Sequence, residues 1–550
     1  MRAAALFVVS VVTVGASLLV PASTRGEGGA VAAESDIVRG NIIQTTDGTL
    51  QGVAADGVVA FKGIPFAAPP VGPLRWRAPQ PAARWDGVRS AASYGNDCMQ
   101  NRFIFDSAPS SQPLSEDCLY LNVWTPSATV SAKHPVMVWI HGGALITGSG
   151  NSGVYDGSSF ARKGIVLVTI NYRLGRFGFF AHPALTKENP DGPLGNYGLM
   201  DQIAALKWVK ANIAAFGGDP ANVTIFGESA GGSSVNNLMV SPATTGLFAK
   251  AIVESGGGRE RTPWIHDGHP EAGPSAEAAG ENYAKSLGVE TQDAAALRAI
   301  PAKDVLGDLQ FWSNDPDTWT GAMIDGKILP KPAMEAFSLG EQHKLPYLIG
   351  TNSFEFGHPL FMGMMSSAVR KKLVGMGKKG DQMLALYGPL PRAASKGGAA
   401  QVGLGKIGAE IVSDAAFVEP ARSLASYASN GGQPTYLYQF AYVAEEKRGD
   451  LTGALHASEV PYVFNTLSVV PRDTYSKADE AAGEKVQAYW VNFARTGNPN
   501  GGGLPQWPAY SASDDAQMSF TNDGPVVLRN YNRARLDFLA ANAKPFGAAD

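Results

Sequence analysis

One serine between two glycines is the strongest chemical signal of the sequence. Ser229 is the centre of Gly-Glu-Ser-Ala-Gly, residues 227–231, which follows the apolar run 222–226 and precedes a run typical of a helix. A sharp turn from strand to helix can present a serine hydroxyl above a sheet, and it needs small residues two positions away on either side. We therefore predict that Ser229 is a catalytic nucleophile; the alternative is an ordinary glycine-rich turn.

A histidine must activate this serine, because a free hydroxyl is a weak nucleophile. Hydrolases with such a turn carry the acid and then the histidine after the serine in chain order. The histidines that follow Ser229 are His266, His269, His343, His358 and His456. Only His456, which lies in a loop after the apolar run 435–440, leaves room for an acid on a separate strand end. We predict His456 as the general base and interpret the other four as surface histidines.

The acid of this triad should end a strand between Ser229 and His456. Glu355 is the only carboxylate in residues 351–357, which follow the apolar run 347–350. A carboxylate there would hold the imidazole tautomer and stabilise the imidazolium. We predict Glu355 as the acid; the alternative is a solvated glutamate beside a turn.

Acyl transfer also needs backbone donors for the oxyanion that forms on the substrate carbonyl. Residues 141–144, His-Gly-Gly-Ala, follow the apolar run 136–140. Small residues let backbone N–H groups point inward. We predict the N–H groups of Gly143, Ala144 and Ala230 as the oxyanion donors, and a structural role for His141.

The strands that must position these residues are predicted by six apolar runs: 136–140, 165–170, 222–226, 251–253, 347–350 and 435–440. Runs that are apolar on both faces are typical of parallel strands covered by helices, and the spacing of apolar residues predicts a helix within 200–216. We therefore expect an α/β fold with a mostly parallel sheet, and a β-meander over 36–66. The helix-like stretches 257–340 and 358–430 are predicted insertions that form a lid and wall the site.

Composition and charge limit the kind of protein. The chain has 550 residues, of which 45% are hydrophobic and 17% are charged, and its net charge is −4. An apolar chain of this length buries a large core, which excludes a disordered protein. It has no strongly basic field, so we expect no nucleic-acid partner.

The N-terminus is typical of an export signal. Arg2 is followed by an apolar stretch over 3–20, with small-residue cleavage candidates near 22 and near 33. We predict a signal peptide over 1–33, a secreted or periplasmic protein, and a single domain over 34–550 that carries both insertions. The alternative is a membrane anchor, although polar residues make 3–20 marginal as a spanning helix. We expect no membrane span in the mature form.

Cys98 and Cys118 are the only cysteines in the sequence. In an exported protein an even pair is typical of a disulfide, and the alternative is two unrelated buried thiols. Two cysteines exclude a cysteine-based zinc cluster or an iron–sulfur site. The chemistry predicted for Ser229 needs no metal and no organic cofactor.

Motifs along nearly the whole chain resemble the type-B carboxylesterase/lipase family, the carboxylesterase and cholinesterase branch of the α/β-hydrolase fold. They include FKGIPFAAPPVGPLRWRAPQP (61–81), SEDCLYLNVWTP (115–126), HGGALITGSG (141–150), GTNSFEFG (350–357) and GALHASEVPYVF (453–464). The resemblance implies the α/β-hydrolase fold and the triad of Ser229, Glu355 and His456. It also implies a disulfide between Cys98 and Cys118 at the rim of the site.

Three departures from the family pattern bear on the substrate. Cholinesterases carry a tryptophan for a choline cation in the disulfide loop, but residues 99–117 contain none, so Phe103 or Phe105 is expected at the rim. Ala144 stands where many relatives have a third glycine, and its methyl group should narrow the acyl site and disfavour very bulky alcohols. The Asp-Glu-Gly of the family around the acid is Phe-Glu-Phe at 354–356, which removes a carboxylate and adds bulk.

These features predict a serine carboxylic-ester hydrolase that acts on small ester substrates through an acyl-enzyme. A lipase, lactonase, amidase or thioesterase could use the same site, because a fold alone does not decide the substrate. A non-catalytic, cholinesterase-like binding protein is the remaining alternative, and the complete triad argues against it. The sequence leaves the physiological ester and the oligomeric state open.

Overall fold

The computed structural model describes residues 41–103, 106–126, 132–259, 262–267, 273–310, 315–359, 362, 375–388, 398–470 and 473–543. The predicted signal peptide and Phe105 lie outside the described residues. Both insertions are described in part. Within the described chain, no helix combines the length and the apolar character that crossing a membrane requires.

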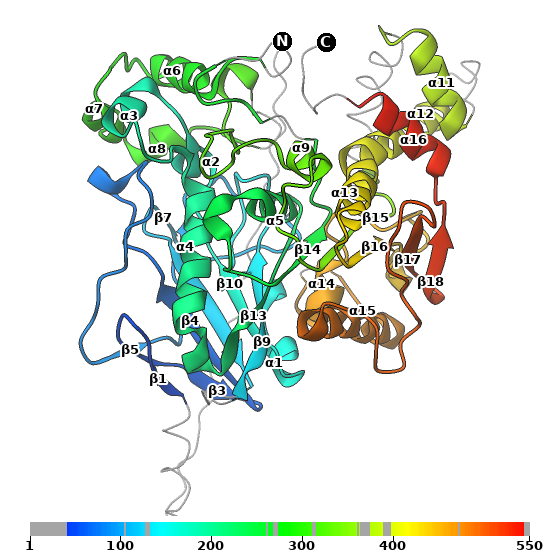
Figure 1. Ribbon diagram of the computed structural model, residues 1–550, viewed down its shortest axis with the longest axis horizontal. Coiled ribbons are helices and arrows are strands. Elements are labelled where there is room, and N and C mark those ends of the chain that lie inside the picture. The colour runs from blue at the N-terminus through cyan, green and yellow to red at the C-terminus, as the bar shows by residue number, and fades with distance from the viewer. Residues whose placement is uncertain are drawn as a thin grey trace, which may run out of the picture. The chain divides into compact units, whose positions relative to one another are not determined.

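The largest sheet of the described chain has eleven strands (Figure 1). In spatial order these are β18 (Gly524–Arg529), β17 (Ala516–Thr521), β16 (Thr435–Phe440), β15 (Tyr347–Asn352), β14 (Lys250–Glu254), β13 (Gly218–Glu228), β9 (His134–Ile140), β10 (Val166–Ile170), β8 (Tyr120–Thr125), β4 (Val58–Pro65) and β3 (Val53–Ala55). Neighbours from β17 to β10 pair in parallel. The pairs at both edges of the sheet are antiparallel. The six predicted runs all lie in the parallel part.

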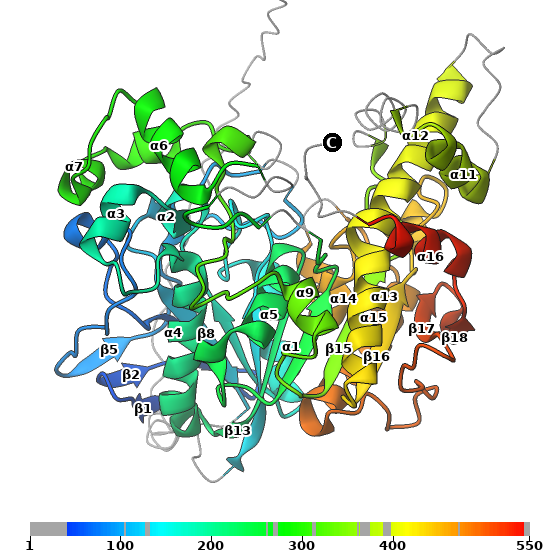
Figure 2. The same cartoon turned by 45° about the horizontal axis from the view of Figure 1, so that its top comes forward.

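Both faces of this sheet are buried under helices, which explains why its strands are continuous apolar runs. Successive side chains of a strand point to opposite faces, so Val138 of β9 joins one core and Trp139 joins the other. The helices are α4 (Tyr197–Asn212), α5 (Ala230–Val240) and α13 (Glu419–Asn430) on the first face (Figures 1 and 2), and α1 (Ser158–Arg162) and α15 (Lys477–Thr496) on the second.

The meander predicted over 36–66 is wrong in one respect, because its strands belong to two sheets. β1 (Ile42–Gln44) and β2 (Thr49–Gln51) form a hairpin beside β5 (Val88–Ser90), whereas β3 and β4 form a second hairpin at the edge of the main sheet. The chain changes sheets at Gly52, where a Cβ would lie 2.7 Å from a backbone carbonyl oxygen of β4. Only glycine fits this close approach at the point where the chain passes from one sheet to the other.

Helices occupy both insertions. The first contains α6 (Ala276–Ser286), α7 (Ala294–Arg298), α8 (Ala302–Leu306) and α9 (Ala333–Ser338). The second contains α11 (Lys378–Tyr387), α12 (Gly398–Ser413), a π-helical turn (Asp414–Val418) and α13. Figure 2 shows α11 and α12 beside the C-terminal α16 (Arg533–Ala541). These three helices and the π-helical turn bury a separate apolar cluster formed by Met383, Tyr387, Ile411, Val418, Leu536 and Leu539.

The described chain also has short strands and short α-helices. They are β6 (Asp97–Cys98), β7 (Leu114–Ser115), β11 (Phe179–Phe180), β12 (Gly195–Asn196), α2 (Gly175–Gly178), α3 (Pro183–Glu188) and α14 (Val460–Phe464). β6 and β7 pair in parallel beside the cysteines, and a disulfide joins Cys98 to Cys118. Both cysteines are buried.

Candidate active site

Ser229 lies on a tight turn between the end of β13 and the start of α5. Its backbone has φ +56° and ψ −124°, a conformation that is uncommon for a residue with a side chain. The turn closes because the residues two positions away are glycines. A Cβ on Gly227 would lie 2.6 Å from the carbonyl oxygen of Ile140, and a Cβ on Gly231 would overlap the same atom. The serine hydroxyl is therefore presented at the carboxyl edge of the sheet.

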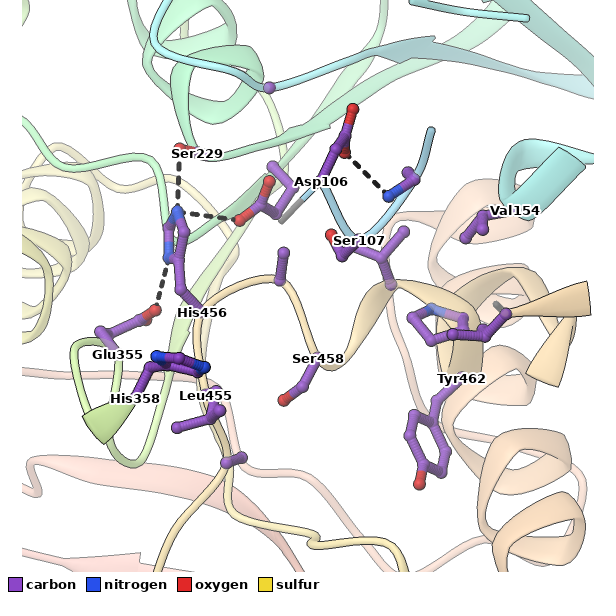
Figure 3. A pocket seen from close by; sticks show the side chains of 18 of the residues that line it. Asp106, Ser107, Val154, Ser229, Glu355, His358, Leu455, His456, Ser458 and Tyr462 are labelled. Atoms are coloured by element: carbon purple, nitrogen blue, oxygen red, sulfur yellow. Dashed lines mark hydrogen bonds and ion pairs between the residues drawn. The ribbon is translucent and has the colours of Figure 1, made fainter. Parts of the chain in front are cut away.

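His456 joins Ser229 to Glu355 through its two ring nitrogens (Figure 3). Its Nε2 lies 2.9 Å from Oγ of Ser229, and its Nδ1 lies 2.7 Å from Oε2 of Glu355. The side chain of His456 keeps 30% of its surface exposed, so a bound molecule can reach it. The structure thus brings the three predicted triad residues together from the segments that follow β13, β15 and β16.

Glu355 is held in place by two donors besides the histidine. Its Oε1 accepts hydrogen bonds from the hydroxyl of Ser255, at 2.7 Å, and from the backbone N–H of Asn352, also at 2.7 Å. The backbone N–H of His456 donates to the carbonyl oxygen of Glu355 at 3.1 Å. The carboxyl group is fully buried. These contacts fix which oxygen of Glu355 faces His456.

The turn that follows β9 lies against Ser229. A Cβ on Gly142 would be 3.0 Å from Cβ of Ser229. The next two residues have φ values of +100° at Gly143 and +57° at Ala144, and both line the cavity in front of the serine. In the described part of the chain, no acceptor pairs with the N–H of either residue. Ala230 begins α5, where backbone N–H groups have no partner inside the helix. The three predicted oxyanion donors therefore lie around Ser229.

The segment that follows Cys98 is hydrogen-bonded to this turn. Gln100 follows Cys98 by two residues, and its Oε1 accepts hydrogen bonds from the hydroxyl of Thr147, at 2.6 Å, and from the N–H of Gly148, at 2.8 Å. The Nε2 of Gln100 donates to the carbonyl oxygen of Gly148 at 2.8 Å. A disulfide that closes a loop of this size contributes about 3 kcal/mol. The bridge thus restrains a segment that holds the oxyanion turn.

The ring of His141 lies beneath the same turn, as the structural role predicted for it requires. It is buried and stacks on Tyr172, with ring centroids 4.4 Å apart. Burial lowers the pKa of His141 to about 4. The ring is therefore neutral at physiological pH, and its Nδ1 lies 2.8 Å from the carbonyl oxygen of Gly142.

Three buried glutamates besides Glu355 lie near the triad. Glu228, the last residue of β13, places Oε1 3.2 Å from Nε2 of His456, and burial raises the pKa of Glu228 to about 7. Burial also raises the pKa of Glu254 to about 8 and that of Glu459 well above its usual range. Burial alone would lower the pKa of His456, but the carboxylates of Glu228, Glu355 and Glu459 outweigh burial and raise it above its usual value.

The triad opens into a cavity of about 530 Å³. Residues 106–108 of the disulfide loop, Phe103 and residues of the segment 442–475 form much of its wall, and Phe356 and Phe417 lie beside the histidine. The predicted lid needs a correction: no described residue of 257–340 lines this cavity. Three helices of that insertion, α6, α7 and α8, pack on β11, α3 and α2 respectively, and its fourth helix, α9, packs on α5 and α13.

Several residues of the site were not predicted from the sequence. Glu228 could have been found, because it adjoins Ser229 at a strand end that the pattern predicts to be buried. Gln100 could have been suspected from its place beside Cys98. Phe417 had no signal, because its position depends on how the second insertion folds back onto the sheet. In the described chain, no group of three or more His, Cys, Asp or Glu residues is placed to hold a metal ion.

The arrangement can perform acyl transfer. Ser229 has a base within hydrogen-bond distance, the base has an orienting carboxylate, and backbone donors lie around the nucleophile. This set of groups matches the requirements of a serine nucleophile with an oxyanion site. The geometry supports the roles predicted for these residues; the roles themselves remain predictions.

Comparisons with known proteins agree on one family. The family model described as "Carboxylesterase family" matches residues 39–539. The fumonisin B1 esterase of Sphingopyxis macrogoltabida is 36% identical over 87% of this chain and 86% of its own length. The para-nitrobenzyl esterase of Bacillus subtilis is 35% identical over 89% of this chain and 96% of its own length.

Similar solved structures are also esterases. The carboxylesterase EST55 of Geobacillus stearothermophilus at pH 6.2 has a TM-score of 0.72 and 36% identity, and the match covers 90% of this chain and all of that one. A structure named PNB esterase has a TM-score of 0.74 and 33% identity, with 90% and 99% of the two chains covered.

Proposed function

Because this chain belongs to the carboxylesterase family, has its α/β-hydrolase fold and is a carboxylic-ester hydrolase, we propose that it hydrolyses small esters through an acyl-enzyme on Ser229. His456 acts as general base and general acid, and Glu355 orients it. The observation that carries this proposal is the hydrogen-bonded line from Ser229 through His456 to Glu355, which opens into the cavity.

Acylation starts when Oγ of Ser229 attacks the carbonyl carbon of the ester and passes its proton to Nε2 of His456. The carbonyl oxygen becomes an oxyanion, which accepts hydrogen bonds from the N–H groups of Gly143, Ala144 and Ala230. The imidazolium then protonates the alcohol oxygen, the C–O bond breaks, and the alcohol leaves. Glu355 stabilises the positive charge that His456 carries in between.

Deacylation repeats these steps with water in place of the serine. His456 removes a proton from the water, which attacks the acyl carbon, and then returns the proton to Oγ of Ser229. The products are the acid and the free enzyme. Every proton is carried by His456, so both halves depend on one imidazole.

A partitioning experiment tests the acyl-enzyme. Esters that share one acyl group but differ in their alcohol form the same intermediate on Ser229. With methanol added, this intermediate divides between water and methanol, so we expect the same ratio of acid to methyl ester from every member of the series. A ratio that changes with the leaving alcohol would mean that water attacks the ester directly.

The pH dependence of kcat/KM tests the charges around His456. His456 is a base only when it is neutral, so kcat/KM falls as the pH falls through its pKa. Glu228, Glu355 and Glu459 raise that pKa above 6.5. We expect Glu228→Gln to move this acid limb to lower pH, because a neutral amide no longer stabilises the imidazolium. The exposed Glu446→Gln serves as the control. An acid limb that stays in place or moves to higher pH in Glu228→Gln would contradict this account.

Assays of triacylglycerols, lactones, amides and thioesters beside simple esters would separate the alternatives that use the same site. Export is also a proposal: the signal peptide over 1–33 lies outside the described residues, and N-terminal sequencing of the protein from culture medium and periplasm would test it.

A further inference from the structure

We propose that Phe356 and Phe417 form an aromatic wall beside His456 that limits the width of the leaving alcohol. This inference rests on the proposed function, because it assigns the alcohol side of the same site. The rings of Phe356 and Phe417 have centroids 5.6 Å apart, and both line the cavity. "Aromatic wall" refers to these two side chains.

The wall lies directly against the catalytic imidazole. The ring centroid of Phe417 is 4.9 Å from that of His456, and the ring of Phe356 is nearly parallel to the imidazole at 6.5 Å. Rings at 4.9 Å are in contact, so no substrate atom fits between Phe417 and His456. Both phenylalanines and His456 line the same cavity, so we place the wall beside a group bound at Nε2.

The chemistry says which group that is. His456 protonates the leaving oxygen, so the alcohol oxygen must lie within hydrogen-bond distance of Nε2. The carbonyl oxygen points instead toward the N–H groups of Gly143 and Ala144. The reacting carbon carries an acyl chain, a carbonyl oxygen and an alcohol oxygen. The alcohol is therefore the group that lies against His456 and the aromatic wall.

The two phenylalanines that flank Glu355 have different surroundings. Phe354 is buried, and its ring and Cβ fill the space beside Gly357 and Gly453. Phe356 is half-buried and faces the cavity. Only Phe356 therefore adds its bulk to the site, at the position where the family resemblance predicts a glycine.

A π-helical turn places Phe417. The N–H of Glu419 donates to the carbonyl oxygen of Asp414, five residues earlier, and Pro420 follows without an N–H of its own. A proline within a helix removes one backbone hydrogen bond, and both prolines and π-turns bend helices. One extra residue in the turn rotates the helix surface, and Phe417 lies on this turn. π-turns are frequent at functional sites.

Hydrogen bonds anchor the chain segments that carry the two rings of the wall. The N–H of Phe356 donates to the hydroxyl of the buried Ser413 at 3.1 Å, so the loop after Glu355 is bonded to the residue before the π-turn. The carboxyl group of Asp414 accepts a hydrogen bond from the hydroxyl of Tyr387 at 2.8 Å. A rigid wall discriminates by size, because it cannot yield to a wider group.

The experiment compares alcohols of different width at a constant acyl group. Ethyl acetate and cyclohexylmethyl acetate are hydrolysed by the wild type, Phe356→Ala, Phe356→Trp and Phe417→Ala. The readout is the ratio of kcat/KM for the wide ester to that for the narrow one. Ethyl acetate and ethyl benzoate form the matched series in which only the acyl group varies. Phe538→Ala is the control, because Phe538 is half-buried against the α11–α12–α16 cluster but does not line the cavity.

We expect both alanine variants to raise the alcohol ratio about tenfold, the scale of discrimination by a methylene-sized change in an apolar pocket. Phe356→Trp should lower it. The acyl ratio should stay constant, and Phe538→Ala should leave both ratios unchanged. The alcohol ratio should rise in Phe356→Ala and fall in Phe356→Trp. A loss of folding would not change this ratio in opposite directions, so the two variants together distinguish a wall from a folding defect.

Two results would contradict the proposed role of the aromatic wall. If Phe356→Ala and Phe417→Ala lower kcat/KM for every ester by one common factor, the aromatic pair positions His456 and selects nothing. If the acyl ratio changes and the alcohol ratio does not, the wall borders the acyl group. In contrast, Ser229→Ala activity equal to that of the wild type in the same assay would overturn the proposed function together with the wall.

Discussion

Replacement of Ser229 by alanine is expected to lower kcat for ester hydrolysis by about 10⁴- to 10⁶-fold, the loss typical of removing a serine nucleophile. Alanine has no atom that can attack the carbonyl carbon, so His456 has no hydroxyl to activate. The residual rate would come from water that His456 and the oxyanion donors activate directly. Steady-state rates on a short-chain chromogenic ester, with the thermal unfolding midpoint of each protein, would measure this.

The control for Ser229→Ala is a second serine of the same cavity. Ser107 is exposed and lines the cavity, and Ser107→Ala should leave the rate within a few-fold of the wild type. Ser229→Ala should also unfold at nearly the wild-type temperature, since the hydroxyl's described partner is the ring of His456. Wild-type activity in Ser229→Ala, confirmed with independently purified protein, would show that another group is the nucleophile.

Replacement of Glu355 by glutamine should cost about 10⁴-fold in kcat, the effect of losing the orienting carboxylate of a triad. In the wild type both carboxyl oxygens accept hydrogen bonds: Oε2 from Nδ1 of His456, and Oε1 from Ser255 and Asn352. An amide has only one acceptor oxygen. If this oxygen stays with Ser255 and Asn352, the NH₂ group faces Nδ1 and favours the tautomer that carries its proton on Nε2. That tautomer cannot accept the proton of Ser229.

A matched control exists on the neighbouring strand. Glu254 is also buried, and its Oε1 accepts a hydrogen bond from Nε1 of Trp490 at 2.8 Å. Burial raises the pKa of Glu254 to about 8, so its carboxyl group is mostly neutral at pH 7 and an amide resembles it closely. Glu254→Gln should therefore change kcat by no more than a few-fold. A loss of less than tenfold in Glu355→Gln would leave Glu355 without the role of the orienting acid.

The layered architecture could be predicted from local patterns. The run 136–140 is apolar at every position, which is typical of a strand buried on both faces. The mostly parallel sheet with helices on both faces is confirmed. The strand order and the edge hairpins could not be predicted. Hydrogen bonds between strands join residues that are far apart in the chain, so local patterns carry no information about which strands become neighbours.

Part of the candidate site could likewise be predicted from the sequence, and part of it could not. Ser229 has a local signature, since its turn demands glycines at fixed positions, and the carboxyl ends of parallel strands meet at one edge, which is why Glu355 and His456 could be found by elimination. The first insertion was wrongly placed over the site, because helical patterns carry no information about which surface a helix covers.

The sequence by itself determined the chemical groups of this protein, the order in which they follow one another, and the layers that carry them, because these depend on residue types and short periodicities. Only the tertiary structure decided their environment. It placed Glu228 beside His456, set Gln100 behind the oxyanion turn, and brought the π-turn with Phe417 onto the imidazole. Burial, electrostatics and the shape of a cavity arise from residues that are distant in the chain, so no local pattern contains them.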